Sequence, residues 1–590
     1  MMGYRLDDQS LYLAFTITDD SFIEDTSATA QWNSQDGLEL CIDARHLQSV
    51  SGVASFMYSK KLRNINKAYY DPFASAASWD IMEVAVKMEG NQRIYEWRIK
   101  LGDQLEVGKS IGIDFNLFDL DADKSFSFGG WGKGGPKFRN PNALGDIILL
   151  PSKQKLGTVT GNIEWDKKIN SPLPQQVRLN SVQNKKLWVT TGVDSLGNYS
   201  VNIPTGDYEI ALPNAFYLNG GKVYALPSTG LATVASRAGQ ESLINKLTIP
   251  STPAPDLIPE KGILLNFQPT DVEKIDQFIE TYRKYYKIPG VSLALIKDGK
   301  LVYHKTYGVR NTMTQQAVDG NTLFEAASIT KPVFAFAVQR LAERGVIDLN
   351  KPLYEYLPYK DIEQDERYKL ITAKHVLTHR TGFPNWRWMN PDGKLNIRFT
   401  PGTAYNYSGE GFEYLKLVVE KITGKKVEQV LQEEVIEPMG LYHTFFSRND
   451  SLRRMVAEGH FDGMPNYDEL PQSPGMAWSM NTEAKIFTNF MLYMLEQKGL
   501  NETTYETMFR KQSEFPGEEK PKYPSYMGMS LEIRETPFGK SFGHGGNNGD
   551  FKCKFEVYKD LKAGYVIFTN SNTSDVLLES IRQFLVEGKE

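Results

Sequence analysis

The chain has 590 residues, of which 41% are hydrophobic and 24% are charged, and its formal net charge is −5. This length exceeds what one hydrophobic core organises, so we expect three or four domains of ordinary globular composition. The weak negative charge argues against nucleic acid or an anionic membrane surface as the main partner, and no apolar run reaches the roughly 18 residues of a transmembrane segment.

Cysteine and histidine usage limits the disulfide and metal chemistry of the chain. Cys41 and Cys553 lie far apart, and the seven histidines form no HExxH or comparable pair. We therefore expect no disulfide framework, no metal enzyme and no cofactor. Cys553 alternates with charged residues in FKCKFEV (551–557), which predicts a side chain that faces a core.

The N-terminal sequence MMGYRLDDQSLYLAF contains no charged-then-apolar signal peptide and enters a strand pattern almost at once. We interpret this abrupt start as an N-terminal truncation. The missing signal then carries little information about location.

Residues 1–150 are predicted to form a β-sandwich. Apolar residues alternate or cluster between Gly, Asp, Asn and Ser breaks in the segments 11–19, 36–44, 79–88, 93–101 and 110–123. Spaced strands of this kind are typical of a sandwich. Their order resembles the family 9 carbohydrate-binding modules and related DOMON-type domains, a resemblance that implies carbohydrate as a candidate partner.

Two features of this segment invite a binding role. Trp32 and Trp131 are candidates to stack on a sugar ring, although core or loop packing explains them at least as well. The acidic run DLDAD (119–123) suggests calcium, but an EF-hand loop needs Gly at its sixth position and Glu at its twelfth. Those positions hold Lys124 and Gly130, so we predict no metal site.

Residues 151–250 form a second predicted β-rich unit. Strand patterns occur at 157–165, 175–182, 186–212 and 245–249, and LGN and PTGD supply turn chemistry. The stretch TGVDSLGNYSVNIPTGDYEI (191–210) resembles the carboxypeptidase regulatory-like family, a small immunoglobulin-like sandwich. We expect this unit to provide spacing or support, and the proline-rich residues 251–267 to form a stiff linker.

Residues 268–590 are predicted to fold as one α/β (α+β) domain. A helix at 270–286 opens with Thr270 and Glu273 in capping-box spacing. Two strands joined by Asp298-Gly299 follow, and then a mostly helical stretch from 324 to about 500. Strand patterns return at 527–535, 551–559 and 563–570, before a last helix at 574–588. We predict an antiparallel sheet completed from both ends of the domain, with a helical lobe between.

The first chemical motif lies in FEAASITKPVFAF (324–336). Ser328 and Lys331 are three residues apart, which on a helix places both side chains on one face. A serine hydroxyl needs a neighbouring base to become a nucleophile, and an amine whose pKa is lowered by a dry pocket can serve. Pro332 fits only the first turn of a helix, so Ser328 lies near the N-terminus, where N–H groups favour an anionic transition state. The spacing alone is weak evidence, but the apolar run that follows Lys331 disfavours a solvated lysine.

Two further motifs follow in order, TPGTAYNYSGEGF (400–412) and SFGHGGNNGDF (541–551). With Ser328 and Lys331 they resemble the serine β-lactamase-like family, in the branch of class C β-lactamases, esterases and D-peptidases. The resemblance spans 268–590 and includes three scaffold stretches, HVLTHRTGFP (375–384), the segment 413–446 and MAWSMNTEAKIFTNFM (476–491).

The resemblance assigns roles to three side chains. Ser328 matches the acylating serine and Lys331 its activating lysine. Tyr407 matches the family tyrosine, which moves the proton between the serine and the leaving group.

The third motif supplies the strand beside the nucleophile. His544, Gly545 and Gly546 occupy the place of the family's Lys-Thr-Gly, and glycine there lets substrate lie close along the strand edge. The backbone N–H of Asn547 would pair with that of Ser328 as the oxyanion hole.

Two departures from the family pattern weaken the β-lactamase interpretation. The asparagine that often follows the tyrosine by two residues, and binds the amide of a penicillin-like substrate, is Gly409 here. A permanent cation for the substrate carboxylate is replaced by His544, which at an ordinary pKa is only partly charged near pH 7. Both departures leave acyl transfer itself untouched.

Other conspicuous residues have weaker claims. Ser541 in GKSFG fits GxSxG, but no helix follows it, so we reject a nucleophile elbow. His375 and His379 are expected to be structural. Trp386 and Trp388 lie on an expected loop and either line the substrate cleft or pack within the loop.

Taken together, the sequence predicts an exported bacterial serine hydrolase, two β-sandwiches ahead of a catalytic domain, that cleaves an ester or amide through an acyl-enzyme on Ser328. The leading substrates are small carboxylic esters and D-amino-acid peptides. The alternatives are a β-lactamase, a penicillin-binding sensor with slow turnover, and a carbohydrate-binding adhesin with an idle hydrolase domain. The intact serine, lysine and tyrosine set argues against an idle site.

Overall fold

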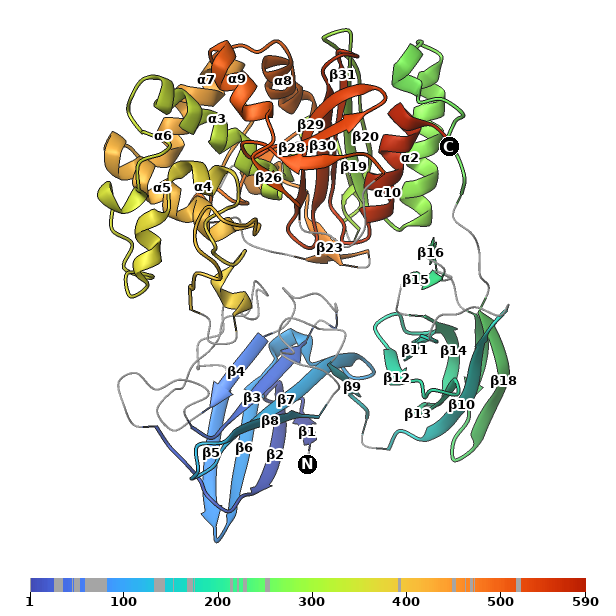
Figure 1. The fold of residues 1–590 in the computed structure, drawn as a ribbon. Helices are drawn as coiled ribbons and strands as arrows, with labels where there is room; N and C mark the ends of the chain where they lie inside the picture. Colours follow the sequence, from blue (N-terminus) through green and yellow to red (C-terminus); the bar gives the residue numbers. More distant parts are fainter. Residues whose placement is uncertain are drawn as a thin grey trace. The chain divides into compact units, whose positions relative to one another are not determined.

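A computed structural model of the protein describes residues 2–25, 35–44, 46, 54–58, 82–131, 144–151, 153–166, 173–174, 176–212, 216–219, 222–225, 231–249, 255–312, 314–390, 394–447, 452–461, 463–466, 471, 473–515 and 522–589. The chain divides into two compact units (Figure 1), residues 1–254 with 464–469 and residues 255–463 with 470–590. The described residues of the first unit form mainly β-strands, and the second unit combines a sheet with helices.

The first sandwich of the all-β unit contains the five strands that the sequence predicts. One sheet has the order β1-β2-β6-β5 and the other the order β4-β3-β7-β8, with β9 also pairing β7. Its core is a layer of buried Leu, Ile and aromatic side chains, among them Leu40, Trp97 and Ile111. The strands are β1 (Met2–Arg5), β2 (Ser10–Thr18), β3 (Gly37–Asp43), β4 (Ala54–Tyr58), β5 (Met82–Glu89), β6 (Gln92–Lys100), β7 (Ser110–Leu120), β8 (Phe126–Gly130) and β9 (Gly145–Ile148).

The second sandwich pairs a sheet of order β13-β10-β18 with one of order β12-β11-β14-β17, beside the hairpin β15-β16. Within the first sheet β10 and β18 run parallel. A buried contact joins the two sandwiches, because the His46 ring stacks on Trp188 at 3.4 Å and its Nε2 lies 2.7 Å from Asp146 Oδ1. The strands are β10 (Leu156–Trp165), β11 (Gln176–Ser181), β12 (Trp188–Gly192), β13 (Asn198–Pro204), β14 (Gly206–Ala211), β15 (Phe216–Asn219), β16 (Lys222–Ala225), β17 (Ala232–Ser236) and β18 (Glu241–Ile249).

The second unit is organised by a nine-stranded sheet of order β21-β20-β19-β31-β30-β29-β28-β27-β26. β19 pairs antiparallel with β31, so strands from both ends of the unit meet at the centre of the sheet, as predicted. Helices α2 and α10 lie together on one side of this sheet, and the helical lobe lies on the other (Figure 1). The strands are β19 (Gly290–Lys297), β20 (Lys300–Asn311), β21 (Gln316–Ala317), β26 (Ser513–Glu514), β27 (Ser525–Met527), β28 (Glu532–Thr536), β29 (Gly539–Asn547), β30 (Lys552–Tyr558) and β31 (Ala563–Thr569).

Buried apolar residues from many segments of the second unit, those of α3 among them, pack into one core that holds the helical lobe together. The helices are α2 (Asp271–Tyr285), α3 (Thr330–Glu343), α4 (Ala373–Leu377), α5 (Gly409–Thr423), α6 (Val427–Leu431), α7 (Glu437–Met439), α8 (Ala484–Leu495), α9 (Glu502–Phe509) and α10 (Asp575–Arg582), and the short strands outside the main sheet are β22 (Phe324–Glu325), β23 (Gly459–Phe461), β24 (Met464–Asn466) and β25 (Asn481–Thr482). No helix of the described residues has the length and apolar character needed to cross a membrane.

Two local predictions had different outcomes. The Asp298-Gly299 hairpin is confirmed, because both residues have positive φ, 51° and 69°, as a tight turn between right-twisted strands requires. The capping box at the start of α2 is wrong. Thr270 has a helical backbone and makes no side-chain cap, and Asp271 instead accepts the N–H of Gln268 at 2.8 Å.

Residues 255–266, which the sequence assigns to the linker, belong to the second unit. Tyr282 donates its hydroxyl to the Pro255 carbonyl at 2.8 Å, and Ile263 and Leu264 are buried. The remaining linker residues 251–254 lie outside the described residues. The proposed boundaries at 150, 250 and 267 stay predictions.

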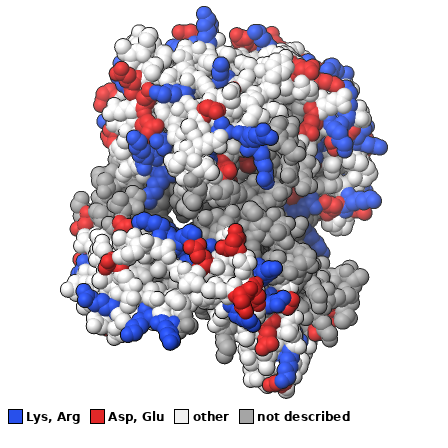
Figure 2. Space-filling model, turned by 180° about the vertical axis from the view of Figure 1, so that it is seen from behind, with Lys and Arg blue, Asp and Glu red and all other residues white. Residues whose placement is uncertain are grey.

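Charged side chains of the described residues are interspersed on the face shown in Figure 2, with acidic and basic groups side by side on each unit. This mixture accords with the small net charge of −5. It gives that face no large field of one sign to attract a polyanion.

Candidate active site

Ser328 lies in a single 3-10 turn, Ala327–Ile329, that runs directly into α3. The turn is strained at Ala327, whose φ is 45°, a region that side chains other than glycine rarely adopt. The Thr330 hydroxyl secures the turn by donating to the Ala327 carbonyl at 2.6 Å and accepting the N–H of Met480 at 3.0 Å. Ser328 therefore stands at the N-terminal end of α3, as its spacing from Pro332 predicts.

Lys331 is the buried partner of this serine. Its side chain is 1% exposed, and its Nζ lies 3.1 Å from Ser328 Oγ and 2.8 Å from the Ala477 carbonyl oxygen. Burial lowers the pKa of Lys331 to about 7, and the charge of Glu413 opposes that effect. Near neutral pH a large fraction of the amine is therefore uncharged, with a lone pair that can accept the serine proton.

Glu413 and Ala477 support the lysine from outside the predicted motifs. Glu413 accepts the Ala477 N–H at 3.2 Å, and the carbonyl of the same Ala477 accepts from Lys331. A second bond holds Glu413, since Lys416 Nζ lies 2.7 Å from its other oxygen. The sequence did not indicate this link, because a backbone carbonyl leaves no residue-type signal.

Tyr407 is the third member of the site. Its ring centre lies 4.7 Å from Lys331 Nζ. Burial raises the pKa of Tyr407 far above its usual range, although the influence of the Ser328 side chain on its hydroxyl tends to lower that pKa. Tyr407 is therefore a protonated phenol at neutral pH, able to give a proton rather than take one from the serine.

His379, expected to be structural, lies against Tyr407. The two rings are stacked with their centres 4.3 Å apart. His379 Nδ1 accepts the N–H of Ser408 at 3.1 Å, so Nε2 carries the proton of the neutral ring. Burial, with the nearby charges of Lys331 and His544, lowers the pKa of His379 well below its usual value.

The end of β29 approaches the Ser328 turn closely. A Cβ on Gly546 would lie 2.6 Å from the Ala326 carbonyl oxygen and 2.4 Å from Cys553 Sγ, so only glycine fits there. A Cβ on Gly545 would meet nothing nearer than 3.9 Å. Asn547 is the last residue of β29, immediately after this contact. Cys553 is 1% exposed, which confirms its predicted place in the core.

His544, which the sequence places where the family has a permanent cation, is buried on β29. It is 3% exposed, and its Nδ1 lies 2.5 Å from the Gly545 carbonyl oxygen, so Nδ1 donates. Burial lowers the pKa of His544 below its ordinary value, and the charge of Lys331 adds to the effect while Glu532 opposes it. The ring is therefore mainly neutral at pH 7 and carries less charge than a histidine of ordinary pKa.

Trp386 and Gly409 are in direct contact. A Cβ on Gly409 would lie 2.7 Å from two carbons of the Trp386 indole. Trp386 is partly buried against the helical core, whereas Trp388 is 60% exposed. The two tryptophans that the sequence treats alike therefore occupy different environments.

The remaining candidates on this unit have structural surroundings. Ser541 lies within β29, is 1% exposed and donates to Glu556 at 2.7 Å, so it is not at a strand–turn–helix elbow. His375 Nδ1 lies 3.1 Å from the Leu370 carbonyl oxygen, and its ring lies beside Gly402, where a Cβ would be 2.9 Å from Nε2.

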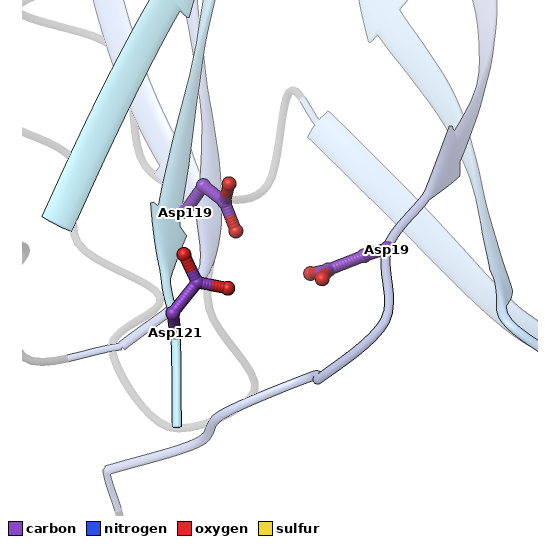
Figure 3. A group of neighbouring side chains, drawn as sticks. All are labelled: Asp19, Asp119 and Asp121. Carbon is purple, nitrogen blue, oxygen red and sulfur yellow. The ribbon is translucent and has the colours of Figure 1, made fainter. Parts of the chain in front are cut away.

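An acidic cluster lies on the first sandwich (Figure 3). Asp19, after β2, points toward Asp119 and Asp121 from the run at the end of β7, and one oxygen of each lies within 4.8 Å of the others. Burial, followed by the charges of Asp19 and Asp121, raises the pKa of Asp119. Three carboxylates provide fewer ligands than the six to eight oxygens that Ca²⁺ takes, so the cluster by itself does not establish a metal site.

The candidate sugar-stacking residues divide between described and undescribed parts of the chain. Trp131 is 49% exposed, and its ring is parallel to that of Phe115 with centres 6.2 Å apart. A Cβ on Gly145 would lie 2.6 Å from the Trp131 indole, so one part of the ring is packed. Trp32 lies outside the described residues.

Curated relatives match only part of the chain. It is 25% identical over 203 residues to Protein flp of Staphylococcus aureus strain MRSA252, a match that covers 32% of this chain and 41% of that protein. It is also 25% identical over 244 residues to a Beta-lactamase of Yersinia enterocolitica, covering 39% of this chain and 61% of that protein. The chain thus spans about two fifths of the length of Protein flp.

Among solved structures, the chain is similar to the octameric penicillin-binding protein homologue from Pyrococcus abyssi. The TM-score is 0.47 at 22% sequence identity, over 53% of this chain and 77% of that chain. The resemblance of residues 191–210 to the carboxypeptidase regulatory-like family stays a prediction.

Two family models match the chain in the predicted order. The model described as carbohydrate family 9 binding domain-like matches residues 4–151, and the Beta-lactamase model matches residues 275–587. These matches confirm the predicted resemblances and the multidomain fold class. Because the second model covers more than half of the 590 residues, the chain belongs to the β-lactamase family, with a family 9 carbohydrate-binding-like domain ahead of the family region.

Proposed function

We propose that the protein is a serine hydrolase that forms an acyl-enzyme on Ser328 and cleaves a small carboxylic ester or a D-amino-acid peptide. The observation that carries the proposal is the pair of Ser328 Oγ and Lys331 Nζ, 3.1 Å apart. The lysine is buried and its pKa is about 7, which suits it to remove a proton from serine at neutral pH.

Acylation then follows from the protonation states of the three side chains. Uncharged Lys331 takes the Ser328 proton as Oγ bonds to the substrate carbonyl carbon, and the carbonyl electron pair moves to oxygen. The backbone N–H groups of Ser328 and Asn547 stabilise that oxyanion. When the bond to the leaving group breaks, the Tyr407 phenol gives the leaving group its proton, and the Lys331 ammonium restores the phenol.

Deacylation reverses the proton transfers. A water molecule attacks the acyl carbon and gives its proton to the Lys331 and Tyr407 pair. Ser328 Oγ leaves as the acid product forms and regains the proton. The net reaction consumes one water and requires no metal or cofactor.

The surroundings of the site favour an ester or D-peptide over a β-lactam. Gly409 and the Trp386 indole replace the amide side chain that the family pattern offers to a penicillin-like substrate. The mainly neutral His544 replaces the permanent cation for a substrate carboxylate. A β-lactam is therefore the second candidate substrate.

The first sandwich supports a role in placing the enzyme on carbohydrate, since residues 4–151 match a carbohydrate-binding-like family. Trp131, half exposed, is one candidate contact with a sugar. A carbohydrate-binding module joined to a hydrolase suits work outside the cell, so we propose that the protein is exported.

Serine-directed labelling tests the nucleophile. A fluorophosphonate should add one label to the protein, and Ser328→Ala should abolish both the label and turnover. Ser541→Ala is the matched control, because Ser541 is buried in β29 and should leave labelling unchanged. A label that persists in Ser328→Ala would contradict the assignment.

A substrate panel separates the functional alternatives. Chromogenic esters, D-Ala peptides and a chromogenic cephalosporin should be compared, and we expect turnover of an ester or peptide. A label without turnover of any of them would favour the slow penicillin-binding sensor. Absence of any label would favour the adhesin with an idle hydrolase domain.

Double substitution tests whether the base and the phenol act together. Lys331→Ala and Tyr407→Phe should each lower kcat by about 10³-fold, and the double variant little further, because both groups move one proton. Multiplicative losses would show independent roles.

A further inference from the structure

The direction of side chains beside Tyr407 is set by the extended backbone of Ser408, whose φ and ψ are −140° and 120°. In an extended chain, residues two apart point to the same side. Any side chain at position 409 would therefore point to the same side as the Tyr407 phenol, which contacts Ser328. The Ser408 side chain points the other way and is buried against the Pro384 carbonyl.

The space on that side of position 409 is filled by an aromatic ring. Two carbons of the Trp386 benzo ring lie 2.7 Å from where a Cβ of residue 409 would be, and a third ring carbon lies at 3.1 Å. Separations under 3.0 Å leave no room for a side chain unless the ring moves. Gly409 and Trp386 are thus a matched pair, in which the absence of one side chain makes room for the other.

Asn385, the residue before Trp386, is hydrogen-bonded to the start of α5 and so holds the backbone of Trp386 in place. The Asn385 carbonyl oxygen accepts the N–H groups of Gly409 and Glu410 at 3.0 and 3.1 Å. The Asn385 side-chain oxygen accepts the Gly409 N–H at 2.9 Å. This amide oxygen is therefore engaged by the backbone.

The residue on the C-terminal side adds a second anchor. Arg387 binds Glu410 through Nε and Nη2, at 3.0 and 2.8 Å, and places Nη1 2.6 Å from Asp361. The bidentate pair joins the loop of Trp386 to the first turn of α5. Anchors on both sides make the indole a rigid part of the site, with a low entropic cost of ordering when substrate binds.

We propose that Trp386 determines the acyl-group specificity of this site, by giving the substrate an aromatic wall beside Tyr407 where a polar side chain at position 409 would otherwise lie. The inference rests on the proposed acyl-enzyme function of Ser328. Flat apolar acyl groups gain burial against the indole, whereas the N–H and C=O of an acylamino group lose water and find no partner on it. The preferred substrates are esters or amides of aryl or alkyl carboxylic acids, and N-acylated amino acids are disfavoured. Of the two proposed substrate classes, the wall therefore favours the small carboxylic ester over an N-acylated D-amino-acid peptide.

Three p-nitrophenyl esters with one leaving group isolate the acyl group. Phenylacetate carries a flat apolar group, N-acetylglycinate carries an acylamino group of similar length, and acetate carries only a methyl group. We expect kcat/KM for phenylacetate to exceed that for N-acetylglycinate by about tenfold or more in the wild-type enzyme.

Four variants of the full chain test the wall. Trp386→Ala should lower kcat/KM for phenylacetate by about tenfold and change acetate by less than about threefold, and Trp386→Phe should restore most of the loss. Gly409→Asn alone should impair hydrolysis of all three esters, because its side chain meets the indole at 2.7 Å. Combining Gly409→Asn with Trp386→Ala should relieve this clash and shift the preference toward N-acetylglycinate.

Labelling by a small fluorophosphonate separates failure of this inference from failure of the proposed function. If wild type is labelled at Ser328 but Trp386→Ala keeps the wild-type ratio of phenylacetate to N-acetylglycinate, Trp386 does not set specificity. The same conclusion follows if Trp386→Ala gives no rescue of Gly409→Asn. If wild type is neither labelled nor active on any ester, the proposed function itself is overturned, and this inference with it.

Discussion

The imidazole of His379 lies against the phenol of Tyr407, with stacked rings whose centres are 4.3 Å apart. The same imidazole accepts the N–H of Ser408, the residue that follows the tyrosine. One neutral side chain thereby holds both the ring and the backbone of Tyr407 in place. We therefore expect His379 to act as a positioning residue and not as a base, because burial lowers its pKa well below the ordinary value.

Replacing His379 should disturb the position of Tyr407 without removing a titrating group. We expect His379→Ala to lower kcat by about 10- to 100-fold through misplacement of the phenol. The acid limb of the pH profile should keep its midpoint, since Lys331 remains. His379→Asn can still accept the Ser408 N–H and should recover part of the loss. Disappearance of the acid limb in His379→Ala would instead identify His379 as the base.

Lys331 predicts the pH dependence of the reaction. Its amine must be uncharged to accept the Ser328 proton, and its pKa is about 7. Activity should therefore fall as pH decreases through about 7, with one proton taken up. Glu413→Gln removes the negative charge that raises the pKa of Lys331 against the effect of burial. The midpoint of the acid limb should therefore move to lower pH. A midpoint that is the same in both enzymes would show that another group controls the acid limb.

The same buried lysine should reduce stability. The pKa of Lys331 in the folded protein lies below the ordinary 10.5, so between pH 7 and 10.5 the unfolded chain binds more protons than the folded one. The free energy of unfolding therefore rises with pH over this range, and the stability lost to the buried lysine is greatest below pH 7. Lys331→Met should raise the free energy of unfolding by of order 1 kcal/mol or more at pH 6 while abolishing turnover. The difference from wild type in Tm should narrow as pH rises from 7 toward 10. A constant difference would mean that packing and not charge separates the two proteins.

Gly545 and Gly546 offer a matched pair of substitutions on one strand. Gly546→Ala places a methyl 2.4 Å from Cys553 Sγ and 2.6 Å from the Ala326 carbonyl oxygen. This clash should displace β29 from the turn that contains Ser328. We expect a loss of about 1–3 kcal/mol in unfolding free energy and about 100-fold in kcat. Gly545→Ala meets nothing within 3.4 Å and should keep the wild-type Tm. Equal losses of Tm in both would contradict the close approach at Gly546.

The sequence could predict those site residues that belong to short motifs with a fixed spacing. Ser328 and Lys331 share one helical turn, and Tyr407 and His544 lie in stretches whose order along the chain carries the family pattern. Local spacing fixes such residues before any tertiary contact is known.

The contacts of His379 and Trp386 depend instead on packing between two distant loops. Backbone hydrogen bonds connect residues 379–387 to residues 406–410. In one of them the Asn406 N–H donates to the His379 carbonyl at 2.8 Å. No spacing rule reports such pairing. The capping box at Thr270 failed because the sequence matched the motif, whereas Thr270 itself has helical dihedrals and not the extended ones of a capping residue.

His544 provides a test of charge in the binding of anionic substrates. Burial lowers its pKa, so the ring should be mainly neutral from pH 7 upward, and neutral and anionic esters should share one pH profile there. His544→Lys should raise kcat/KM for carboxylate-bearing esters by about tenfold relative to neutral esters, by restoring a cation. His544→Gln, a neutral control, should not change that ratio. A fall in wild-type kcat/KM confined to anionic esters between pH 6.5 and 8 would show a charged His544.

The N-terminal boundary of the catalytic unit is testable by truncation. Ile263 and Leu264, 7% and 0% exposed, pack on the second unit, and Tyr282 binds the Pro255 carbonyl. A chain that begins at Pro255 should keep the kcat/KM of the full chain on a small soluble ester, because the site residues all lie beyond it. A chain that begins at Gln268 loses both buried side chains, each worth roughly 1.5–3 kcal/mol of burial, and should unfold at a lower temperature.

Thermal unfolding and ester turnover together decide between the boundaries. If the chain from Pro255 folds with wild-type stability but is inactive, the β-sandwiches contribute to the site itself. If the chains from Pro255 and Gln268 have equal Tm, residues 255–267 contribute nothing to the folded unit, as expected of the stiff linker that the proline content predicts. We expect neither outcome. The site residues all lie beyond Pro255, and removal of the buried Leu264 side chain leaves a gap in the apolar core that lowers stability.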